Sequence, residues 1–292
     1  MERMLRDKWA IAFFALPALT VFTVFVIGVS VRTVIGSFYD WDGILPGKFA
    51  GFRMYAKMLS DSVFYTSLRN GFISAAMLLA GQTLLGLLLA LILSDRKLKG
   101  KKAFRMSFFV PVVLSVTVGT QLWLFIFRGD GLLNMLLERL GTGYEQYWLN
   151  DTKWAILPVS FVNAWQYMGI YLALFYAGIK SIPEHFYEAA LIDGCGRWRT
   201  WLHVTIPLLR EVMKICVLLA MLGGLNQFAH NQILTAGGPG SSTYSLTLLM
   251  YNKAFANGDF GYGCAVAIVI IVQALLVSWA VNQLFGKERI VY

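Results

Sequence analysis

The chain has 292 residues, of which 58% are hydrophobic and 14% are charged, and its formal net charge is +9. Ordinary soluble domains are about 45–50% apolar and about 25% charged. The composition therefore excludes an ordinary soluble domain and is typical of a protein that lies largely within a membrane.

Six stretches of the sequence contain no Asp, Glu, Lys or Arg and are long enough to cross about 30 Å of hydrocarbon at about 1.5 Å per helical residue. They cover residues 9–31, 71–93, 106–127, 154–179, 215–235 and 262–285. Arg3, Arg6 and Lys8 precede the first stretch, as in a signal peptide, but its apolar run is longer than about 7–15 residues and no small-residue cleavage site closes it. We therefore predict an all-α, polytopic membrane protein with six transmembrane helices, the first of them retained.

Lysine and arginine are distributed unevenly between the connecting segments. If the N-terminus is inside, the inner segments hold 16 of these residues and the outer segments hold 8. Because cytoplasmic loops carry the excess of basic residues, both termini are predicted to face the cytoplasm. The basic stretch DRKLKGKKAFR at 95–105 is interpreted as an inner loop near anionic membrane lipid rather than as a nucleic-acid site.

The sequence lacks the residues that several classes of protein function require. A carrier driven by protons or sodium usually needs a carboxylate inside the bilayer, and none of the six stretches contains one. His230 is the one side chain there that titrates near neutral pH, and a single histidine is more often a hydrogen-bonding group than a proton relay. No GxxxxGK[ST] loop, metal-spaced cluster or GxSxG elbow is present, so we predict no enzyme and no metal site, and any nucleotide energy must come from another chain.

The fourth and fifth stretches carry neutral polar side chains that lipid would not tolerate. SFVNAWQYMGIY at 160–171 places Asn163, Gln166 and Tyr167 on one helical face, and MLGGLNQFAHNQILT at 221–235 contains further amides. An unsatisfied amide in hydrocarbon costs several kcal/mol, so these groups must face other helices or a wet cavity. Hydrogen bonding between helices is one interpretation. The other is a pathway for a neutral polyhydroxyl ligand, since amides donate and accept hydrogen bonds and aromatic rings stack on sugars.

A long polar segment separates these two stretches on the cytoplasmic side. Ser181 followed three residues later by Glu184 predicts a capping box that starts a helix over about 182–193, with Gly194 as its left-handed C-terminal cap. A second short helix is predicted at about 197–205, with Trp198 and Trp201. The residues alone leave two interpretations open: helices that lie flat on the membrane surface, or helices that dock on a partner protein.

The polar segment contains Glu188-Ala189-Ala190, Asp193-Gly194 and Ile206-Pro207. With their spacing, these residues resemble the EAA signature of the inner-membrane permease subunits of binding-protein-dependent ABC importers. Cys195 departs mildly from the pattern, since alanine is common at that position. The stretch ILTAGGPGSSTYSLTLLMYNKAF at 233–255 is similar to the segment after the fifth helix of MalF-like subunits of carbohydrate importers. The resemblance covers essentially the whole chain.

The resemblance implies a MetI-like fold in a single transmembrane permease domain over 1–292, with a core at about 67–285, one extra N-terminal helix at about 9–36, and a cytoplasmic coupling segment at 181–209. It implies that this segment seats on a cytosolic ATPase. The expected coupling residues are Glu188, Ala189, Ala190, Asp193, Gly194, Ile206 and Pro207.

In the maltose importer of this family, sugar contacts come from helices that correspond to the fourth and fifth stretches, with aligned positions at Trp165 to Met168 and Gly224 to Gln227. Together with the amide pattern, this gives the expected substrate pathway: Asn163, Trp165, Gln166, Tyr167, Tyr171, Gly224, Asn226, Gln227 and Asn231.

The implied partners are a second homologous permease subunit, two ABC ATPase subunits that bind ATP and Mg, an extracytoplasmic sugar-binding protein and a neutral sugar or oligosaccharide. No cofactor is expected in this chain, and the implied location is the inner membrane of a bacterium or archaeon. Two alternatives stay open. One is a permease for another solute, such as glycerol-3-phosphate, although an anion would ordinarily want basic groups in the cavity; the other is an ATP-independent channel.

Overall fold

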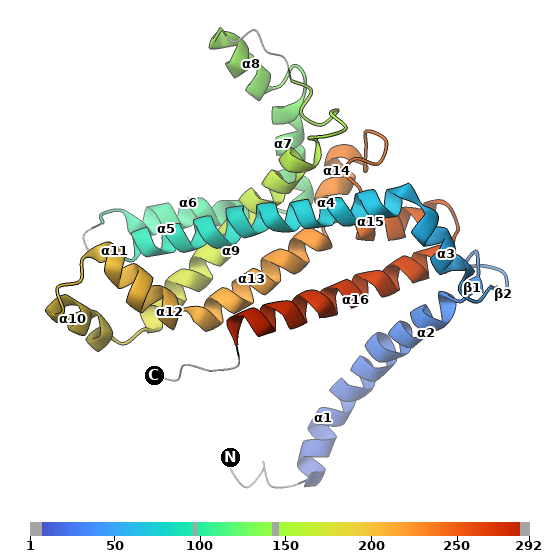
Figure 1. Ribbon diagram of the computed structural model, residues 1–292, viewed down its shortest axis with the longest axis horizontal. Helices are drawn as coiled ribbons and strands as arrows, with labels where there is room; N and C mark the ends of the chain where they lie inside the picture. Colours follow the sequence, from blue (N-terminus) through green and yellow to red (C-terminus); the bar gives the residue numbers. More distant parts are fainter. Residues whose placement is uncertain (1–7, 96–97, 142–145, 287–292) are drawn as a thin grey trace. The chain divides into compact units, whose positions relative to one another are not determined.

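The computed structural model describes residues 8–95, 98–141 and 146–286, which are mainly helical (Figure 1). The chain divides into two compact units, Met1–Asp61 with Met250–Val269 and Ser62–Leu249 with Ile270–Tyr292. The helices α15 (Leu246–Tyr251) and α16 (Phe260–Phe285) belong to both units, because each unit boundary falls within one of them.

The first unit begins with a long apolar helical run. It consists of α1 (Lys8–Phe22), the π-helical turn η2 (Thr23–Gly28) and α2 (Val29–Gly36). Its side chains from Phe13 onward are mostly exposed within the chain, as expected for a helix surrounded by lipid or by another subunit. A short antiparallel hairpin follows, in which β1 (Tyr39–Asp40) pairs with β2 (Lys48–Phe49). In its loop, backbone N–H groups of Ile44 and Leu45 donate to Asp42, which holds the pKa of that carboxyl below its usual value.

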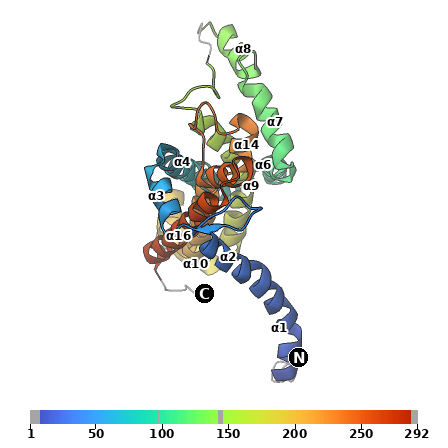
Figure 2. The same cartoon turned by 90° about the vertical axis from the view of Figure 1, so that its right-hand side faces the viewer.

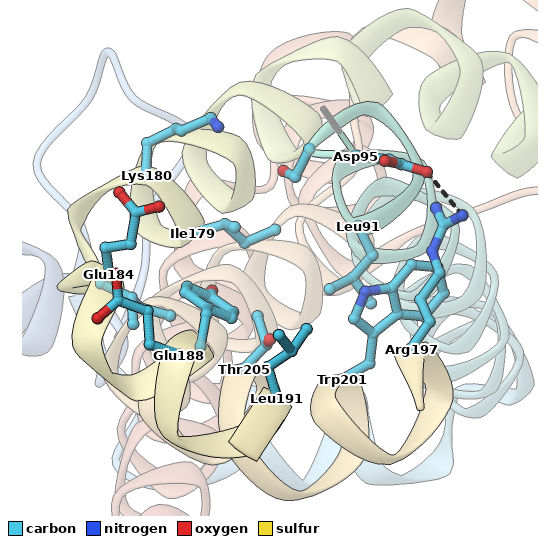
Figure 3. Close-up of a pocket in the computed structure, with 13 residues that line it drawn as sticks. Leu91, Asp95, Ile179, Lys180, Glu184, Glu188, Leu191, Arg197, Trp201 and Thr205 are labelled. Carbon is cyan, nitrogen blue, oxygen red and sulfur yellow. Dashed lines mark ion pairs between the residues drawn. The ribbon is translucent and has the colours of Figure 1, made fainter. Parts of the chain in front are cut away.

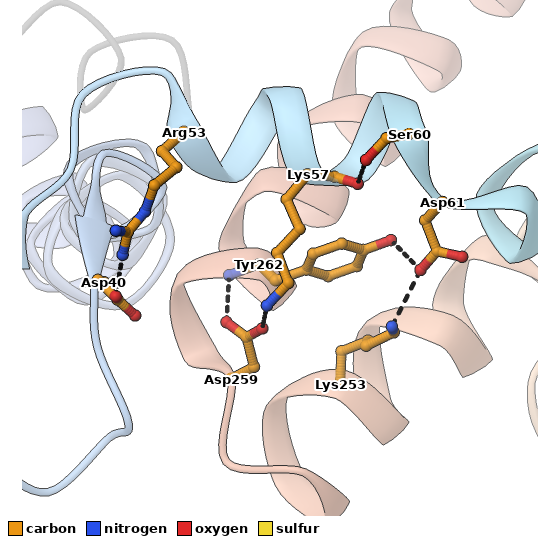
Figure 4. A network of polar contacts seen from close by, with 8 residues as sticks. All are labelled: Asp40, Arg53, Lys57, Ser60, Asp61, Lys253, Asp259 and Tyr262. Carbon is orange, nitrogen blue, oxygen red and sulfur yellow. Dashed lines mark hydrogen bonds and ion pairs between the residues drawn. The ribbon is translucent and has the colours of Figure 1, made fainter.

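Ion pairs connect the remaining parts of this unit with one another (Figure 4). These parts are α3 (Arg53–Ser60), the turn η5 (Asn252–Ala256) and the start of α16. Lys57 Nζ lies 2.5 Å from Asp259 Oδ2, and Lys253 Nζ lies 2.9 Å from Asp61 Oδ2. The buried Tyr262 hydroxyl donates to the same Asp61 oxygen at 3.0 Å. These contacts join segments about 200 residues apart in the sequence.

The second unit contains the other helices. They are α4 (Ser62–Leu78), η3 (Leu79–Leu84), α5 (Leu85–Leu93), α6 (Lys101–Val113), α7 (Val116–Phe127), α8 (Leu132–Arg139), α9 (Ile156–Ser181), α10 (Glu184–Ile192), α11 (Arg197–Thr200), η4 (Trp201–Thr205), α12 (Ile206–Leu208), α13 (Arg210–Leu225) and α14 (Ala229–Thr235). The helix α9 is central, since it packs against α4, η3, α5, α6 and α13.

Small residues allow close helix crossings in this unit. At Gly224 of α13, an added Cβ would lie 2.4 Å from the backbone of Ala75 in α4. At Gly169 of α9, it would lie 2.3 Å from the carbonyl oxygen of Phe108 in α6. Any side chain at these two glycines would therefore push neighbouring backbones apart.

The predicted third span, 106–127, is wrong as a single helix. The axes of α6 and of the segment Val116–Arg139 differ by 99°, and Figure 2 shows α7 and α8 continuing together in a direction different from that of α6. Leu114 adopts an extended conformation at the break, and the Ser115 hydroxyl accepts from the Val118 N–H to cap α7. The chain breaks here because this serine offers the backbone a cap that competes with continuing the helix.

Within the described residues, four helical runs are long and apolar enough to cross a membrane, or five if the bent pair counts as one span. They are Phe13–Gly36, Ser62–Leu93, Arg210–Thr235 and Phe260–Phe285. The helix α9, with 26 residues, is long enough, but its buried polar side chains reduce its hydropathy. The multi-pass all-α architecture is confirmed, whereas the count of six spans and the orientation stay predictions.

Candidate functional site

The helix α10 begins differently from the sequence prediction. Ser181 is the last residue of α9, and its hydroxyl donates to the Gly178 carbonyl at 2.8 Å. Pro183 precedes α10 without a side-chain cap. The predicted capping box is therefore wrong, because α9 extends two residues beyond the predicted end at 179 and includes the serine.

The C-terminal end of α10 agrees with the prediction. Gly194 has a φ of +68°. The Cys195 N–H donates to the Ala190 carbonyl at 2.9 Å, and the Gly194 N–H donates to the Leu191 carbonyl at 3.1 Å. This pair of bonds is the Schellman motif, which requires a left-handed residue where glycine is favoured. The left-handed cap at Gly194 is confirmed.

The second short helix also forms, as α11, η4 and α12 in succession over Arg197–Leu208. Trp198 and Trp201 make an edge-to-face contact with ring centroids 5.0 Å apart. Trp198 is 68% exposed, whereas Trp201 packs against the buried core of the second unit. The two tryptophans, which are equivalent in the sequence pattern, therefore have different environments.

The expected coupling residues are spread over both sides of this segment. Glu188, Ala189, Asp193, Gly194 and Pro207 are exposed, Ile206 is half-buried and Ala190 is buried. Beside them, Leu191 and Ile192 are 79% and 85% exposed. Sequence reasoning missed these two residues, although two large apolar residues at the end of a polar surface helix were the available signal.

A cavity of about 590 Å³ lies between α10, η4 and the ends of α5 and α9 (Figure 3). Leu91, Ile179 and Ile182 contribute apolar walls, while Glu184 and Glu188 come from α10. On another side of the cavity, Arg197 Nη1 lies 2.8 Å from Asp95 Oδ2. Open space therefore separates part of the segment 181–209 from the ends of α5 and α9.

Amide side chains form a second feature, deeper in the same unit. Gln82 Nε2 donates to the backbone carbonyl of Asn163 at 3.1 Å and to its Oδ1 at 3.2 Å. Asn163 Nδ2 then donates to Gln227 Oε1 at 3.1 Å, and Gln227 Nε2 donates to the Val159 carbonyl at 3.4 Å. All three amides are buried. They link η3, α9 and the break between α13 and α14, as the interpretation of hydrogen bonding between helices predicts.

Gln166 makes two further contacts between helices. Its Nε2 donates to the Leu114 carbonyl at the break between α6 and α7, at 3.2 Å. Its Oε1 accepts from His230 Nε2 of α14 at 2.9 Å. His230 therefore acts as a hydrogen-bonding group, as the sequence reasoning favoured.

A cavity of about 380 Å³ lies beside these amides. Among the expected pathway residues, Asn163, Tyr167, Tyr171 and Gln227 line it. Gln82 and His230 line it as well. Sequence reasoning missed Gln82, which is an isolated amide in an otherwise apolar stretch.

The structure does not bring the other expected pathway residues to this cavity. Gln166 forms hydrogen bonds with Leu114 and His230, and Trp165 packs edge-to-face on Trp123. Gly224 packs on α4, and Asn226 follows the last residue of α13. The Asn231 amide donates to the Thr243 carbonyl at 2.6 Å. Gln166, Trp165, Gly224 and Asn231 therefore have structural contacts of their own, whereas the buried Asn226 Oδ1 has no hydrogen-bond partner among the described residues.

Comparison with known proteins gives the chain its family. Residues 82–289 match the family described as "Binding-protein-dependent transport system inner membrane component". A probable ABC transporter permease protein of Pyrococcus horikoshii is 36% identical, with 96% of this chain and 97% of the relative covered. The trehalose/maltose transport system permease protein MalF of Thermococcus litoralis is 33% identical, with 89% of this chain and 88% of the relative covered.

A solved structure has the same fold. The crystal structure of a bacterial ABC transporter involved in the import of the acidic polysaccharide alginate contains a chain that matches with a TM-score of 0.82 and 20% identity, over 97% of both chains. The predicted all-α fold of an ABC importer permease is thereby confirmed, and so is the MalF-like resemblance. The chain belongs to the family of inner-membrane components of binding-protein-dependent transport systems, whose members are transport permeases rather than enzymes.

Proposed function

We propose that this chain is one of two homologous membrane subunits of an ATP-driven importer for a neutral sugar or oligosaccharide. An extracytoplasmic binding protein delivers the sugar, and two cytosolic ATPases bind ATP and Mg and drive transport through the coupling segment 181–209. The complex lies in the cytoplasmic membrane. The family match and the carbohydrate named for the Thermococcus litoralis relative support this assignment.

The observation that carries the ATPase role is the shape of α10 and its end. The helix α10 has nine residues and ends at a Schellman turn. Its residues Glu188, Ala189, Leu191 and Ile192 are exposed. Two large exposed apolar side chains next to small and charged ones are typical of a surface that another protein covers. The membrane-surface alternative would require this same end of the helix to lie in lipid headgroups together with Asp193.

The cavity beside the amide chain supports a neutral solute. Within the described part of the chain, its lining contains no Asp, Glu, Lys or Arg, whereas it contains amides and two tyrosines. An anionic solute would lack a counter-charge here, which argues against glycerol-3-phosphate. Sugar hydroxyls donate and accept hydrogen bonds as amides do, so a sugar can take the place of the bonds that Asn163 makes with Gln82 and Gln227.

Transport then requires the helices that carry these amides to separate. In the arrangement described, the chain of hydrogen bonds from Gln82 to Val159 holds η3, α9 and the end of α13 together. Binding of ATP to the partner subunits favours one arrangement of the coupling segment, and ATP hydrolysis resets it. The amides are therefore exposed to the cavity in one of these two arrangements and hydrogen-bonded to one another in the other.

The test compares Gly194→Glu with Gly196→Glu in the complete importer. Both glycines have open space around an added Cβ, but Gly194 has a φ of +68° and Gly196 has a φ of −69°. Gly194→Glu should insert normally into the membrane yet lose ATP-dependent uptake and co-purification with the ATPase, while Gly196→Glu retains more of both. Uptake that survives ATP depletion would overturn the proposal in favour of a channel, and normal coupling by Gly194→Glu would show that the coupling role lies elsewhere in the chain.

A further inference from the structure

Arg197 connects the coupling segment to a transmembrane helix that does not adjoin it in sequence. Arg197 is the first residue of α11, and its Nη1 lies 2.8 Å from Asp95 Oδ2 (Figure 3). Asp95 follows α5, which ends at Leu93. The side chains of Arg197 and Asp95 are 48% and 28% exposed, so water screens this ion pair less than it screens a fully exposed one.

A second contact fixes the direction of the Arg197 side chain. Its guanidinium lies over the Trp201 ring, 4.7 Å from the ring centroid. Trp201 in turn packs against the core cluster that contains Leu91 of α5. An arginine held between a carboxylate and an aromatic face has little freedom to rotate, so the ion pair has a defined geometry.

The covalent chain links the coupling segment to α9 and α13 but not to α5. Ser181 ends α9 just before α10, and Leu209 joins α12 to α13. Between α10 and the end of α5 lies the cavity of about 590 Å³. Contact across this region is therefore incomplete, and the ion pair crosses it on the α11 side.

We propose that the Asp95–Arg197 pair is a positioning contact that makes α5, and with it the span Ser62–Leu93, follow displacements of the coupling segment. This inference rests on the proposed function, since ATPase binding supplies the displacement. A carboxylate–guanidinium contact is directional, so it resists sideways movement as well as separation. Because η3 of the same span carries Gln82, the contact connects the cytoplasmic segment to the amide chain beside the membrane cavity.

The experiment measures backbone hydrogen exchange in the importer complex isolated with its ATPase subunits, without nucleotide and after trapping with ATP and vanadate. Two peptides are followed, 184–205 of the coupling segment and 85–95 at the end of α5. The variants are Asp95→Arg, Arg197→Asp and the double charge swap. Arg199→Asp is the matched control, because it makes the same charge change two residues away, with the native Asp95–Arg197 pair intact.

In the unmodified complex, trapping should change exchange in both peptides. Each single charge reversal should leave the response of 184–205 in place and reduce the response of 85–95, by up to about fivefold for a pair of this exposure. The double swap should restore the response and Arg199→Asp should retain it. Where a reversed variant fails to insert, Asp95→Asn and Arg197→Gln remove the pair without introducing repulsion and should reduce the response of 85–95 in the same way.

Two other results have separate meanings. An unchanged response of 85–95 in every variant would overturn the positioning role while leaving ATPase coupling intact. If neither peptide of the unmodified complex responds to trapping, the proposed function fails first, and this inference fails with it.

Discussion

Two regions of the second unit use the same residue type for opposite reasons. Gly194, at the end of α10, has a left-handed backbone and open space around it, whereas Gly224, near the end of α13, lies against the backbone of α4. The first glycine is required by the conformation of its own residue, and the second is required by a neighbour about 150 residues away in sequence. The coupling segment is thus specified locally, while the region around the membrane cavity is specified by packing between distant helices.

The largest expected effect distinguishes Gly224 from the adjacent Gly223. A Cβ at Gly224 would lie 2.4 Å from Ala75, whereas at Gly223 the nearest atom is Leu78 Cδ2 at 3.6 Å. Gly224→Ala should therefore reduce the free energy of unfolding by about 1–3 kcal/mol, the typical range for overpacking. Gly223→Ala should have little effect. Thermal unfolding in detergent measures both variants, and equal melting temperatures would show that α13 does not cross α4 this closely.

A smaller effect is expected at Gly194, where conformation rather than space is limiting. Gly194→Ala should destabilise the turn by about 1–2 kcal/mol, the cost of a left-handed residue with a Cβ. Gly194→Asn should recover part of this, since asparagine tolerates the left-handed region. Hydrogen exchange of the Cys195 amide, which donates to Ala190, reports the turn directly. Faster exchange in Asn than in Ala would contradict the conformational explanation.

Each hydrogen bond of the amide chain should contribute less to the free energy of unfolding than either glycine. Asn163→Leu removes the acceptor of Gln82 Nε2 and the donor to Gln227 Oε1. Hydrogen bonds between transmembrane helices contribute about 0.6 kcal/mol on average, so the loss of stability should be near that value per bond. If the same amide contacts sugar, the substitution should impair sugar uptake more than it lowers the stability of the fold. Measuring the KM for uptake beside the melting temperature separates the two effects, and a variant with lower stability but unchanged KM would assign Asn163 a structural role alone.

The smallest effect on stability belongs to the exposed apolar end of α10. Replacing Leu191 and Ile192 together by serine should change the free energy of unfolding by less than about 0.5 kcal/mol, because both side chains are already exposed. Association with the ATPase should nevertheless weaken. Leu202→Ser, at a residue that is 59% exposed on η4, is the control. Equal ATPase recovery from both variants would show that the end of α10 is not the contact surface.

The sequence predictions were accurate for features that neighbouring residues specify and inaccurate for features that depend on packing between distant helices. The helix at 182–193, its left-handed glycine and the second short helix depend on neighbouring residues and could be predicted. The break at Leu114 and Ser115 was missed, because an uncharged stretch from 106 to 127 does not reveal that a serine caps a new helix within it. The capping box at Ser181 failed because the tertiary structure extends α9 to that residue.

The pathway residues were predicted in part for a related reason. Amides in a span must be satisfied, so Asn163, Gln166 and Gln227 were recognisable as polar contacts. The sequence does not specify which of them face one cavity, since that depends on how α9, α13 and α14 are rotated relative to η3. Gln82 was overlooked because a lone amide among leucines carries no periodic signal.

Gln166 has a consequence for how sequence variants of this protein are interpreted. One amide contacts both the carbonyl exposed by the break between α6 and α7 and the histidine of α14. A change to glutamate, as in spontaneous deamidation, would remove the donor to Leu114 and place a negative charge beside His230 in a single event. Variation at this position would therefore disturb two separate helix breaks at once, and an inherited or engineered change there cannot be treated as a local one.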